Sequence, residues 1–329
     1  MSVEIERVLF LIASFLASLC LSLFFCWGLI QLQKRKKIEQ PIHKLGVKSH
    51  FLKTGTPTMG GIGIIFSIFL IYILLDWKSL KNYRLLAMVI GIFSFSIIGI
   101  IDDLLKVIKK NEKGLSAWLR IFLEIEVIII TFIIAGYDDS STWYLNLYPF
   151  NNNLGNNILF LLIAMFGVIA SANSSNLLDG LDGLDGGVFI LALLPVLVLA
   201  FQQGESDLGL LLLLIIGAVI GFLLLNSCPS KIFMGDSGSL FLGAVLAYSL
   251  IYLDKLILLP FIALIYIFET LSVIIQVFHY KRTRKRIFLM APLHHHFEIK
   301  GIPEYKIVFS YYFIQSVISL IVLIMEINL

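Results

Sequence analysis

Long apolar segments alternate with short polar ones along the whole chain. Each apolar segment is about 20 residues long, the length that a helix needs to cross the hydrocarbon core of a bilayer. Backbone polar groups in lipid must bond within their own segment, so we expect these segments to be helices. The pattern predicts an all-α polytopic integral membrane protein with about ten transmembrane helices. The predicted spans are residues 8–31, 58–75, 85–101, 118–136, 157–173, 187–202, 208–226, 238–252, 256–280 and 306–326.

The composition excludes a soluble enzyme. Hydrophobic residues make up 59% of the 329 residues and charged residues only 14%, whereas soluble domains carry about 25% charged residues. The three cysteines, Cys20, Cys26 and Cys228, have the spacing of neither a disulfide framework nor a zinc site. The first apolar segment is too long for a cleaved signal peptide, and its positive charges follow it instead of preceding it.

The positive charges predict the orientation. The first span is followed by "QKRKKIEQPIHKLGVKSHFLKTG", a basic stretch that belongs on the cytoplasmic side. The N-terminus is then outside, and ten spans place the C-terminus outside as well. The 25 Lys and Arg residues agree, because all of them fall on the cytoplasmic side except Arg7, Lys78, Lys81, Arg84 and Lys255.

Four polar clusters fall on that same side. "IIGIIDDLLKVIKK" ends the third span, and "SANSSNLLDGLDGLDGG" follows the fifth. "NSCPSKIFMGDSGSLFLG" joins the seventh and eighth spans, and "KRTRKRIFLMAPLHHHFEIKG" follows the ninth. A chance scatter of polar loops would not place all four on one face. The sequence therefore predicts an active site on the cytoplasmic face.

The second cluster has a period of three, with Asn173, Asn176, Asp179, Asp182 and Asp185. Residues three apart are neighbours on a helix, so the row is expected to line one surface. The glycines between the acids weaken a helix but let backbone approach a ligand closely. The alternative is an ordinary Asp-Gly turn.

The other acids also have two interpretations. Asp102 and Asp103 end a helix, where the dipole disfavours acids, and Lys106 could simply pair with them. "FMGDSGS" places Asp236 at a helix start, where N–H groups favour phosphate. Mg²⁺ prefers carboxylate oxygens and lets substrate phosphates complete its shell. Together these residues favour phosphoryl transfer onto a lipid carrier.

The remaining polar residues are less specific. The side chains of His294, His295 and His296 point in different directions, so substrate binding or capping is favoured over a metal site. Glu269 and Gln276 lie within a span and are functional candidates, although a hydrogen bond between helices is equally compatible. Glu124 and Glu126 are interpreted as structural.

The motifs "KTGTPTMGG", "DDLLK", "NSSNLLDGLDGL", "FMGDSGS" and "MAPLHHHFE" resemble the phospho-N-acetylmuramoyl-pentapeptide transferase family. This family belongs to the polyprenyl-phosphate N-acetylhexosamine-1-phosphate transferase superfamily, and the likeness covers nearly the whole chain. It implies one integral membrane transferase domain, residues 1–329. Its reaction moves phospho-MurNAc-pentapeptide from UDP-MurNAc-pentapeptide to undecaprenyl phosphate, giving undecaprenyl-pyrophosphoryl-MurNAc-pentapeptide (lipid I) and UMP.

The resemblance also implies Mg²⁺ as cofactor, a multi-pass location in the bacterial inner (cytoplasmic) membrane, contact with membrane lipid and no nucleic acid. It leaves a homodimer open. Asp102, Asp103 and Asp236 match the family's catalytic aspartates, with Asp236 and Asn176 as the expected metal ligands. The expected substrate-binding residues are Lys53, Lys106, Arg120, Asn176, Asp179, Asp182, Asn226, Phe233, Gly235, Ser239, Gln276, His294, His295 and His296. Arg120 stands where the family has Lys, and Asp185 stands where a small or apolar residue is usual.

Two alternatives stay open. A sister transferase would use UDP-GlcNAc as its donor, although the His motif argues against it. An ion-coupled transporter would also carry intramembrane acids, but transporter sites lie near the bilayer midplane. Here only Glu269 is deep within a span.

Overall fold

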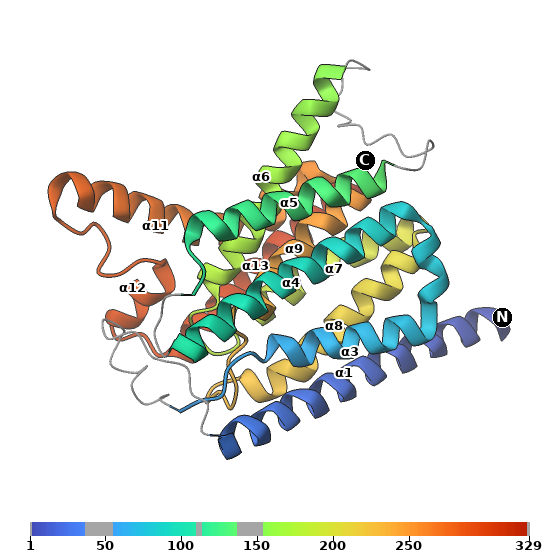
Figure 1. The fold of residues 1–329 in the computed structure, drawn as a ribbon, viewed down its shortest axis with the longest axis horizontal. Coiled ribbons are helices and arrows are strands. Elements are labelled where there is room, and N and C mark those ends of the chain that lie inside the picture. Colours follow the sequence, from blue (N-terminus) through green and yellow to red (C-terminus); the bar gives the residue numbers. More distant parts are fainter. Residues whose placement is uncertain (1, 37–54, 110–113, 137–153, 328–329) are drawn as a thin grey trace.

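The computed structural model describes residues 2–36, 55–109, 114–136 and 154–327, and within these ranges every regular element is a helix. The order of the elements can be followed by colour in Figure 1. The elements are α1 (Ser2–Lys36), α3 (Gly61–Asp76), η1 (Trp77–Lys81), α4 (Tyr83–Lys109), α5 (Ala117–Ala135), α6 (Leu154–Leu178), α7 (Leu184–Gln202), α8 (Ser206–Asn226), α9 (Asp236–Tyr252), η2 (Leu256–Leu258), α10 (Leu259–Ile262), α11 (Leu264–Thr283), α12 (Leu293–Ile299) and α13 (Glu304–Ile327).

The multi-pass helical class is confirmed. Each of the ten predicted segments falls on a helix or, for residues 256–280, on helices joined by a bend. Among the described residues, seven helices are long and apolar enough to cross a membrane, and a pair bent by 69° makes eight. The other two segments are α5, which carries Arg120, Glu124 and Glu126, and α9, which has only 17 residues. Ten crossings and termini on the outside stay predictions.

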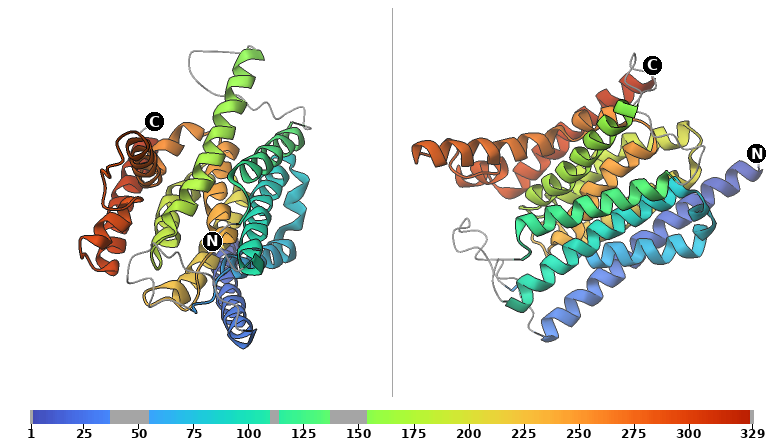
Figure 2. Two further views of the ribbon diagram at one scale, coloured as in Figure 1. Left: turned by 60° about the vertical axis from the view of Figure 1, so that its left-hand side comes forward. Right: turned by 45° about the horizontal axis from the view of Figure 1, so that its top comes forward.

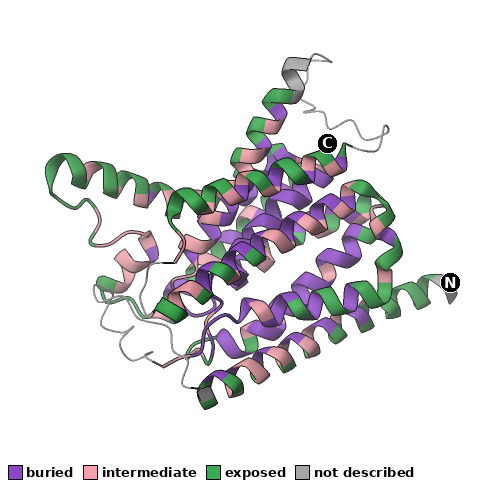
Figure 3. Cartoon of the chain, in the orientation of Figure 1, coloured by how far each residue is buried: buried purple, intermediate pink, exposed green. Residues whose placement is uncertain are grey.

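Helix α9 packs on protein along its whole length. All of its residues from Asp236 to Tyr252 are buried, and the buried positions gather in the middle of the bundle in Figure 3. Two glycines bring neighbouring helices into backbone contact with its first turn. A Cβ on Gly99 of α4 would lie 2.2 Å from the carbonyl oxygen of Asp236, and one on Gly61 of α3 would lie 2.2 Å from the backbone nitrogen of Gly238.

Helices α11 and α12 form an arm at one side of the bundle (Figure 1), here called the α11–α12 arm and comprising residues 264–299. In both views of Figure 2 the arm lies across the bundle from α1. The chain reverses direction after α11, and Gln276 stabilises the returning segment. Its Oε1 accepts hydrogen bonds from the backbone N–H groups of Ile287 and Phe288, each at 3.0 Å, and its Nε2 donates to the Phe288 carbonyl at 2.9 Å.

Candidate active site

Three buried carboxylates meet where α4 ends and α9 begins. Asp102 and Asp103 are each 2% exposed and Asp236 is 8% exposed. One oxygen from each of them lies within 4.8 Å of the others. The sequence predicted that these acids would share one membrane face, and the structure brings them into a single cluster.

Asp103 fixes the position of Asp236. Its two oxygens accept hydrogen bonds from the backbone N–H groups of Asp236, at 3.1 Å, and Ser237, at 3.0 Å. Asp103 therefore caps the start of α9, where N–H groups lack partners and the helix dipole favours negative charge. The residue before, Gly235, has a φ of 78°. A Cβ there would lie 2.5 Å from the Asp103 carboxylate, so glycine is required.

Two basic side chains pair with the carboxylates of this cluster. Lys106 Nζ lies 2.7 Å from Asp102 Oδ2 and 2.8 Å from Asp236 Oδ1. Arg120 Nη1, from α5, lies 3.3 Å from Asp236 Oδ2. Asp102 also accepts a hydrogen bond at 2.6 Å from the backbone N–H of Leu115 through its other oxygen. The helix pair of Asp102 and Lys106 is thus part of a network that joins α4, α5 and α9.

A polar cavity of about 290 Å³ opens beside the carboxylates. Its wall comes from the end of α6 and the turn after it, from the end of α8 and the segment leading into α9, and from α12. Most of the lining residues were predicted from sequence to bind substrate or metal. The lining residues are Asn176, Asp179, Gly180, Leu181, Asp182, Asn226, Phe233, Gly235, Asp236 and His295.

Side chains of this wall also hold its loops. Asn226 accepts a hydrogen bond at 2.9 Å from the backbone N–H of Gly183 and donates one at 2.8 Å to the carbonyl of Ile232. Asn176 Nδ2 donates to Ser239 Oγ at 3.0 Å. This bond ties α6 to the first turn of α9.

The Asn/Asp row does not form the single helical surface that its spacing predicted. Helix α6 ends at Leu178 and α7 begins at Leu184, after Gly183 with a φ of 78°. The glycines break the helix, so Asp179 and Asp182 lie in the turn. The first and last members of the row point elsewhere. Asn173 Nδ2 donates to Glu124, at 2.9 Å to the nearer oxygen, and Asp185 accepts from Ser175 at 2.9 Å.

Two acids of the turn have distinct surroundings. Burial raises the pKa of Asp179 well above its usual range, and the nearby carboxylates of Asp185 and Asp236 raise it further. Asp182 instead accepts a hydrogen bond from the backbone N–H of Ser230 at 3.0 Å. Its own N–H donates to Glu304 at 2.7 Å. Glu304 was missed at the sequence level, although an acid at the start of a helix is a usual N-terminal signal.

The three histidines of α12 make different contacts. His295 lines the cavity, and its Nδ1 lies 3.1 Å from Glu298 Oε2. His296 Nδ1 accepts a hydrogen bond from the backbone N–H of Leu289 at 3.1 Å. Partial burial, and then Lys300, lower the pKa of His296, which fits an imidazole that is neutral and can accept. His294 is completely buried.

Gln276, which was predicted to bind substrate, is not among the residues that line this cavity. Both the amide oxygen and the amide nitrogen of Gln276 hydrogen-bond the backbone of the α11–α12 arm, and its substrate role stays a prediction. Lys53 lies outside the described residues. Lys106 and Arg120 contact the carboxylates, as described above, and Ser239 reaches the site through Asn176.

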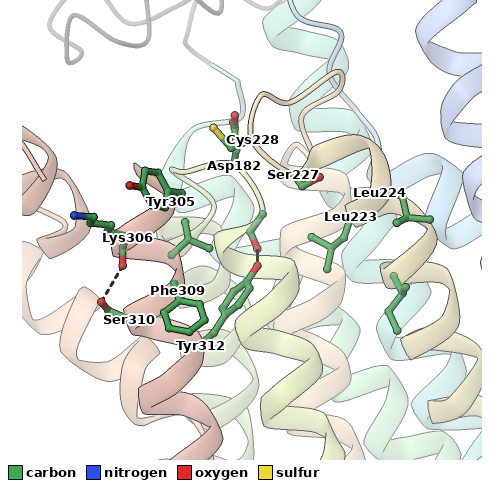
Figure 4. Close-up of a pocket in the computed structure, with 13 residues that line it drawn as sticks. Asp182, Leu223, Leu224, Ser227, Cys228, Tyr305, Lys306, Phe309, Ser310 and Tyr312 are labelled. Carbon is green, nitrogen blue, oxygen red and sulfur yellow. Dashed lines mark hydrogen bonds between the residues drawn. The ribbon is translucent and has the colours of Figure 1, made fainter. Parts of the chain in front are cut away.

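A larger, mostly apolar cavity of about 880 Å³ lies between α8 and α13 and meets the polar one at Asp182. Figure 4 shows its lining, with Leu223 and Leu224 on one side and Phe309 and Tyr312 on the other. The Tyr312 hydroxyl donates a hydrogen bond at 2.5 Å to the carbonyl of Gly183. Helix α13 is thereby bonded to the acidic turn that lines the polar cavity.

Comparison with known proteins extends the likeness over the whole chain. Residues 85–254 match the family model described as glycosyl transferase family 4. A relative from Geobacillus sp. (strain WCH70) is 38% identical and aligns over 98% of this chain and 99% of its own length. One from Buchnera aphidicola subsp. Baizongia pistaciae (strain Bp) is 39% identical over 95% and 97%. One from Staphylococcus carnosus (strain TM300) is 37% identical over 89% and 92%. All three are named phospho-N-acetylmuramoyl-pentapeptide-transferase.

Proposed function

This chain belongs to glycosyl transferase family 4 and, within it, to the phospho-N-acetylmuramoyl-pentapeptide-transferases, and we propose that it makes lipid I. It transfers phospho-MurNAc-pentapeptide from UDP-MurNAc-pentapeptide to undecaprenyl phosphate and releases UMP, as the first membrane step of peptidoglycan synthesis. The observation that carries the proposal is the polar cavity. Residues from separate segments, chosen from the sequence, line it directly beside Asp236 and its two neighbouring carboxylates.

The site is proposed to face the cytoplasm, where a soluble nucleotide donor is available. The basic residues support this side. Lys106 and Arg120 contact the cluster, and Lys300 and Lys281 belong to the α11–α12 arm or follow it directly. Positive charge concentrates on the cytoplasmic side of membrane proteins. A lipid phosphate reaches the same level from the bilayer, so both substrates can meet at the membrane surface.

The residues present fit a Mg²⁺ ion. Mg²⁺ takes hard oxygen ligands and completes its shell with substrate phosphates, and three carboxylates offer such oxygens within 4.8 Å of one another. Asp236 and Asn176 are the ligands proposed from the sequence, and both line the cavity. Asp102 is adjacent, whereas Asp103 already uses both oxygens to cap α9. When bound, the ion would supply electrostatic stabilisation of phosphate charge.

The chain's own residues suit one in-line displacement. An oxygen of the lipid phosphate forms a bond to the β-phosphorus of the donor. The bond from that phosphorus to the bridging oxygen breaks, and its electron pair leaves with UMP. Lys106 and Arg120 lie where they can stabilise the charge on the phosphates. A phosphate monoester has its second pKa near ~6, so the acceptor needs no dedicated base at neutral pH.

A covalent route through an aspartate is disfavoured by the same geometry. Both oxygens of Asp103 accept backbone N–H groups, and Asp102 is bonded to Leu115 and paired with Lys106. A double displacement would release UMP before the lipid arrives. We therefore expect no stoichiometric burst of UMP from delipidated enzyme that is given donor alone. A burst of one UMP per enzyme would restore the covalent route.

The direct test uses radiolabelled UDP-MurNAc-pentapeptide, undecaprenyl phosphate and Mg²⁺ with the purified chain in detergent. The proposal predicts a labelled lipid product, its loss on chelation with EDTA, and no competition from excess UDP-GlcNAc. Preferential use of UDP-GlcNAc would indicate the sister transferase. Ion-driven uptake in proteoliposomes without any lipid-linked product would indicate a transporter.

A further inference from the structure

The buried carboxylate of Glu269 lies within α11 and has no part in the chemistry described above. It is 1% exposed and joins three helices. Its Oε2 accepts a hydrogen bond at 2.6 Å from the backbone N–H of Leu293, at the start of α12. Its Oε1 accepts a hydrogen bond from the hydroxyl of Tyr311 in α13. An ionisable group buried at this depth costs free energy, and such groups usually mark functional positions.

The contacts of Glu269 lead to the polar cavity through His294. Glu269 Oε2 lies 3.4 Å from Nδ1 of this ring, which is completely buried. On the other side of the ring, a Cβ on Gly180 would lie only 2.3 Å from Nε2. Gly180 lines the cavity. The ring is therefore held between the Glu269 carboxylate on one side and the Gly180 backbone on the other.

Helix α13 holds the same turn from the opposite direction. Tyr311 bonds to Glu269, and the next residue, Tyr312, donates to the carbonyl of Gly183 at 2.5 Å. The Tyr312 ring is also close to Gly187, since a Cβ there would lie 2.1 Å from it. The turn that carries Gly180 therefore lies between His294 of α12 and Tyr312 of α13.

We propose that Glu269 is a positioning residue that fixes α12 and the His294 ring against the Gly180 turn and thereby sets the shape of the donor cavity. The inference rests on the proposed function, which assigns this cavity to the donor. Glu269 touches no reacting atom. Its effect reaches the cavity through the placement of His295, the next residue of α12, and through the backbone of the turn.

Glu269→Gln is the decisive substitution. A glutamine has one acceptor oxygen, so it cannot accept from both Leu293 and Tyr311 as the two carboxylate oxygens do, and it removes the negative charge beside His294. We expect α12 to shift and the KM for UDP-MurNAc-pentapeptide to rise by about 10-fold, the size of one charge-assisted hydrogen bond. The KM for undecaprenyl phosphate and the Mg²⁺ requirement should stay unchanged, because the α4–α9 cluster is not touched.

Gly180→Ala tests the same contact from the other side, since the added methyl group meets the His294 ring. It should also raise the donor KM, and the double variant should raise it by less than the product of the two single effects. Glu326→Gln is the matched control. Glu326 is a carboxylate at the far end of α13, paired with Lys255 at 2.6 Å, and its loss should leave both KM values unchanged.

A folded Glu269→Gln enzyme with the wild-type donor KM would overturn the inference, as would independent effects in the double variant. A lower yield of folded protein, with unchanged KM values for the folded enzyme, would show that Glu269 has a merely structural role. If Glu269→Gln does not fold, Tyr311→Phe removes one donor alone and should raise the donor KM by a smaller factor. An unchanged KM there would also overturn the inference. If the unmodified chain makes no lipid I, the proposed function fails instead.

Discussion

The two halves of the site are built in different ways. The α4–α9 half places Asp103 and Asp236 on helices whose backbones touch at Gly99, inside the bundle. The α11–α12 half places His295 on a helix of only seven residues, beyond a 69° bend. A hydrogen bond from the backbone N–H of Leu293 to Glu269 fixes the start of that short helix, and one from the N–H of Phe288 to Gln276 fixes the segment before it.

This difference assigns different tasks to the two halves. Charge stabilisation needs groups held within a fraction of an ångström, which helices in a packed bundle provide. Recognition of a large donor needs a surface that the substrate can still reach. An arm that is held by only a few hydrogen bonds provides such a surface. Changes in the α4–α9 half should therefore abolish turnover. Changes in the α11–α12 arm should mainly weaken use of the donor.

Asp236→Asn should show the largest effect. Asp236 lines the cavity and pairs with Lys106 and Arg120, and as the proposed metal ligand its loss removes several kcal/mol of charge stabilisation, or about 10³-fold in turnover. The measurement is activity as a function of Mg²⁺ concentration. An active variant with an unchanged Mg²⁺ requirement would remove Asp236 from the metal site.

Asp102→Asn should be severely impaired at every pH. Asp102 holds Lys106 and the backbone of Leu115, and neither contact is replaced when the acceptor ionises. The lipid phosphate, with a second pKa near ~6, is fully ionised at pH 9. A pH profile of turnover therefore should show no rescue at high pH. Recovery at pH 9 would instead mean that Asp102 acts as a base.

Gly99→Ala tests the backbone contact between the halves of the carboxylate cluster. A Cβ would lie 2.2 Å from the carbonyl oxygen of Asp236 and 2.6 Å from the nitrogen of Ser237, and backbone cannot yield as a flexible side chain can. We expect a loss of about 1–3 kcal/mol in unfolding free energy together with loss of activity. Gly28→Ala in α1, where nothing lies within 4 Å, is the control in the same thermal unfolding assay. Equal stability of the two variants would contradict the close packing.

The smallest effects should come from the arm. His295→Ala removes a ring from the cavity wall, and His296→Ala removes the acceptor for Leu289. Both should raise the donor KM by about 10-fold, equivalent to roughly 1.4 kcal/mol, with normal amounts of folded protein. Loss of folded protein with normal activity per folded molecule would give the histidines a structural role instead.

Hydropathy made the helices predictable, because ten apolar segments in one chain leave little choice of fold. The predicted topology placed Asp102, Asp103 and Asp236 at helix ends on one membrane face, but it did not determine that their carboxylates lie within 4.8 Å of one another. Their separate tasks could not be predicted. The bond from Asp103 to the start of α9 joins residues 133 positions apart, and no local pattern distinguishes a capping aspartate from a metal ligand.

The spacing of the polar residues predicted the wrong local structure where glycine breaks the helix. The period of three in the Asn/Asp row predicted one helical surface, but Gly183 adopts a φ of 78° and starts a new helix. The amide of Gln276 shows a second limit of prediction from the sequence. A polar residue within a span is a functional candidate, and only the fold reveals that this one bonds the backbone of Ile287 and Phe288.

Equilibrium binding of UDP-MurNAc-pentapeptide to Asp102→Asn and His295→Ala tests the division of tasks most directly. Isothermal titration in Mg²⁺ without the lipid acceptor separates binding from turnover. The account predicts that Asp102→Asn binds the donor with a Kd near that of the unmodified chain yet does not turn over. His295→Ala should bind about 10-fold more weakly, by roughly 1.4 kcal/mol, and turn over bound donor normally. The reverse pattern, with binding lost in Asp102→Asn and kept in His295→Ala, would contradict it.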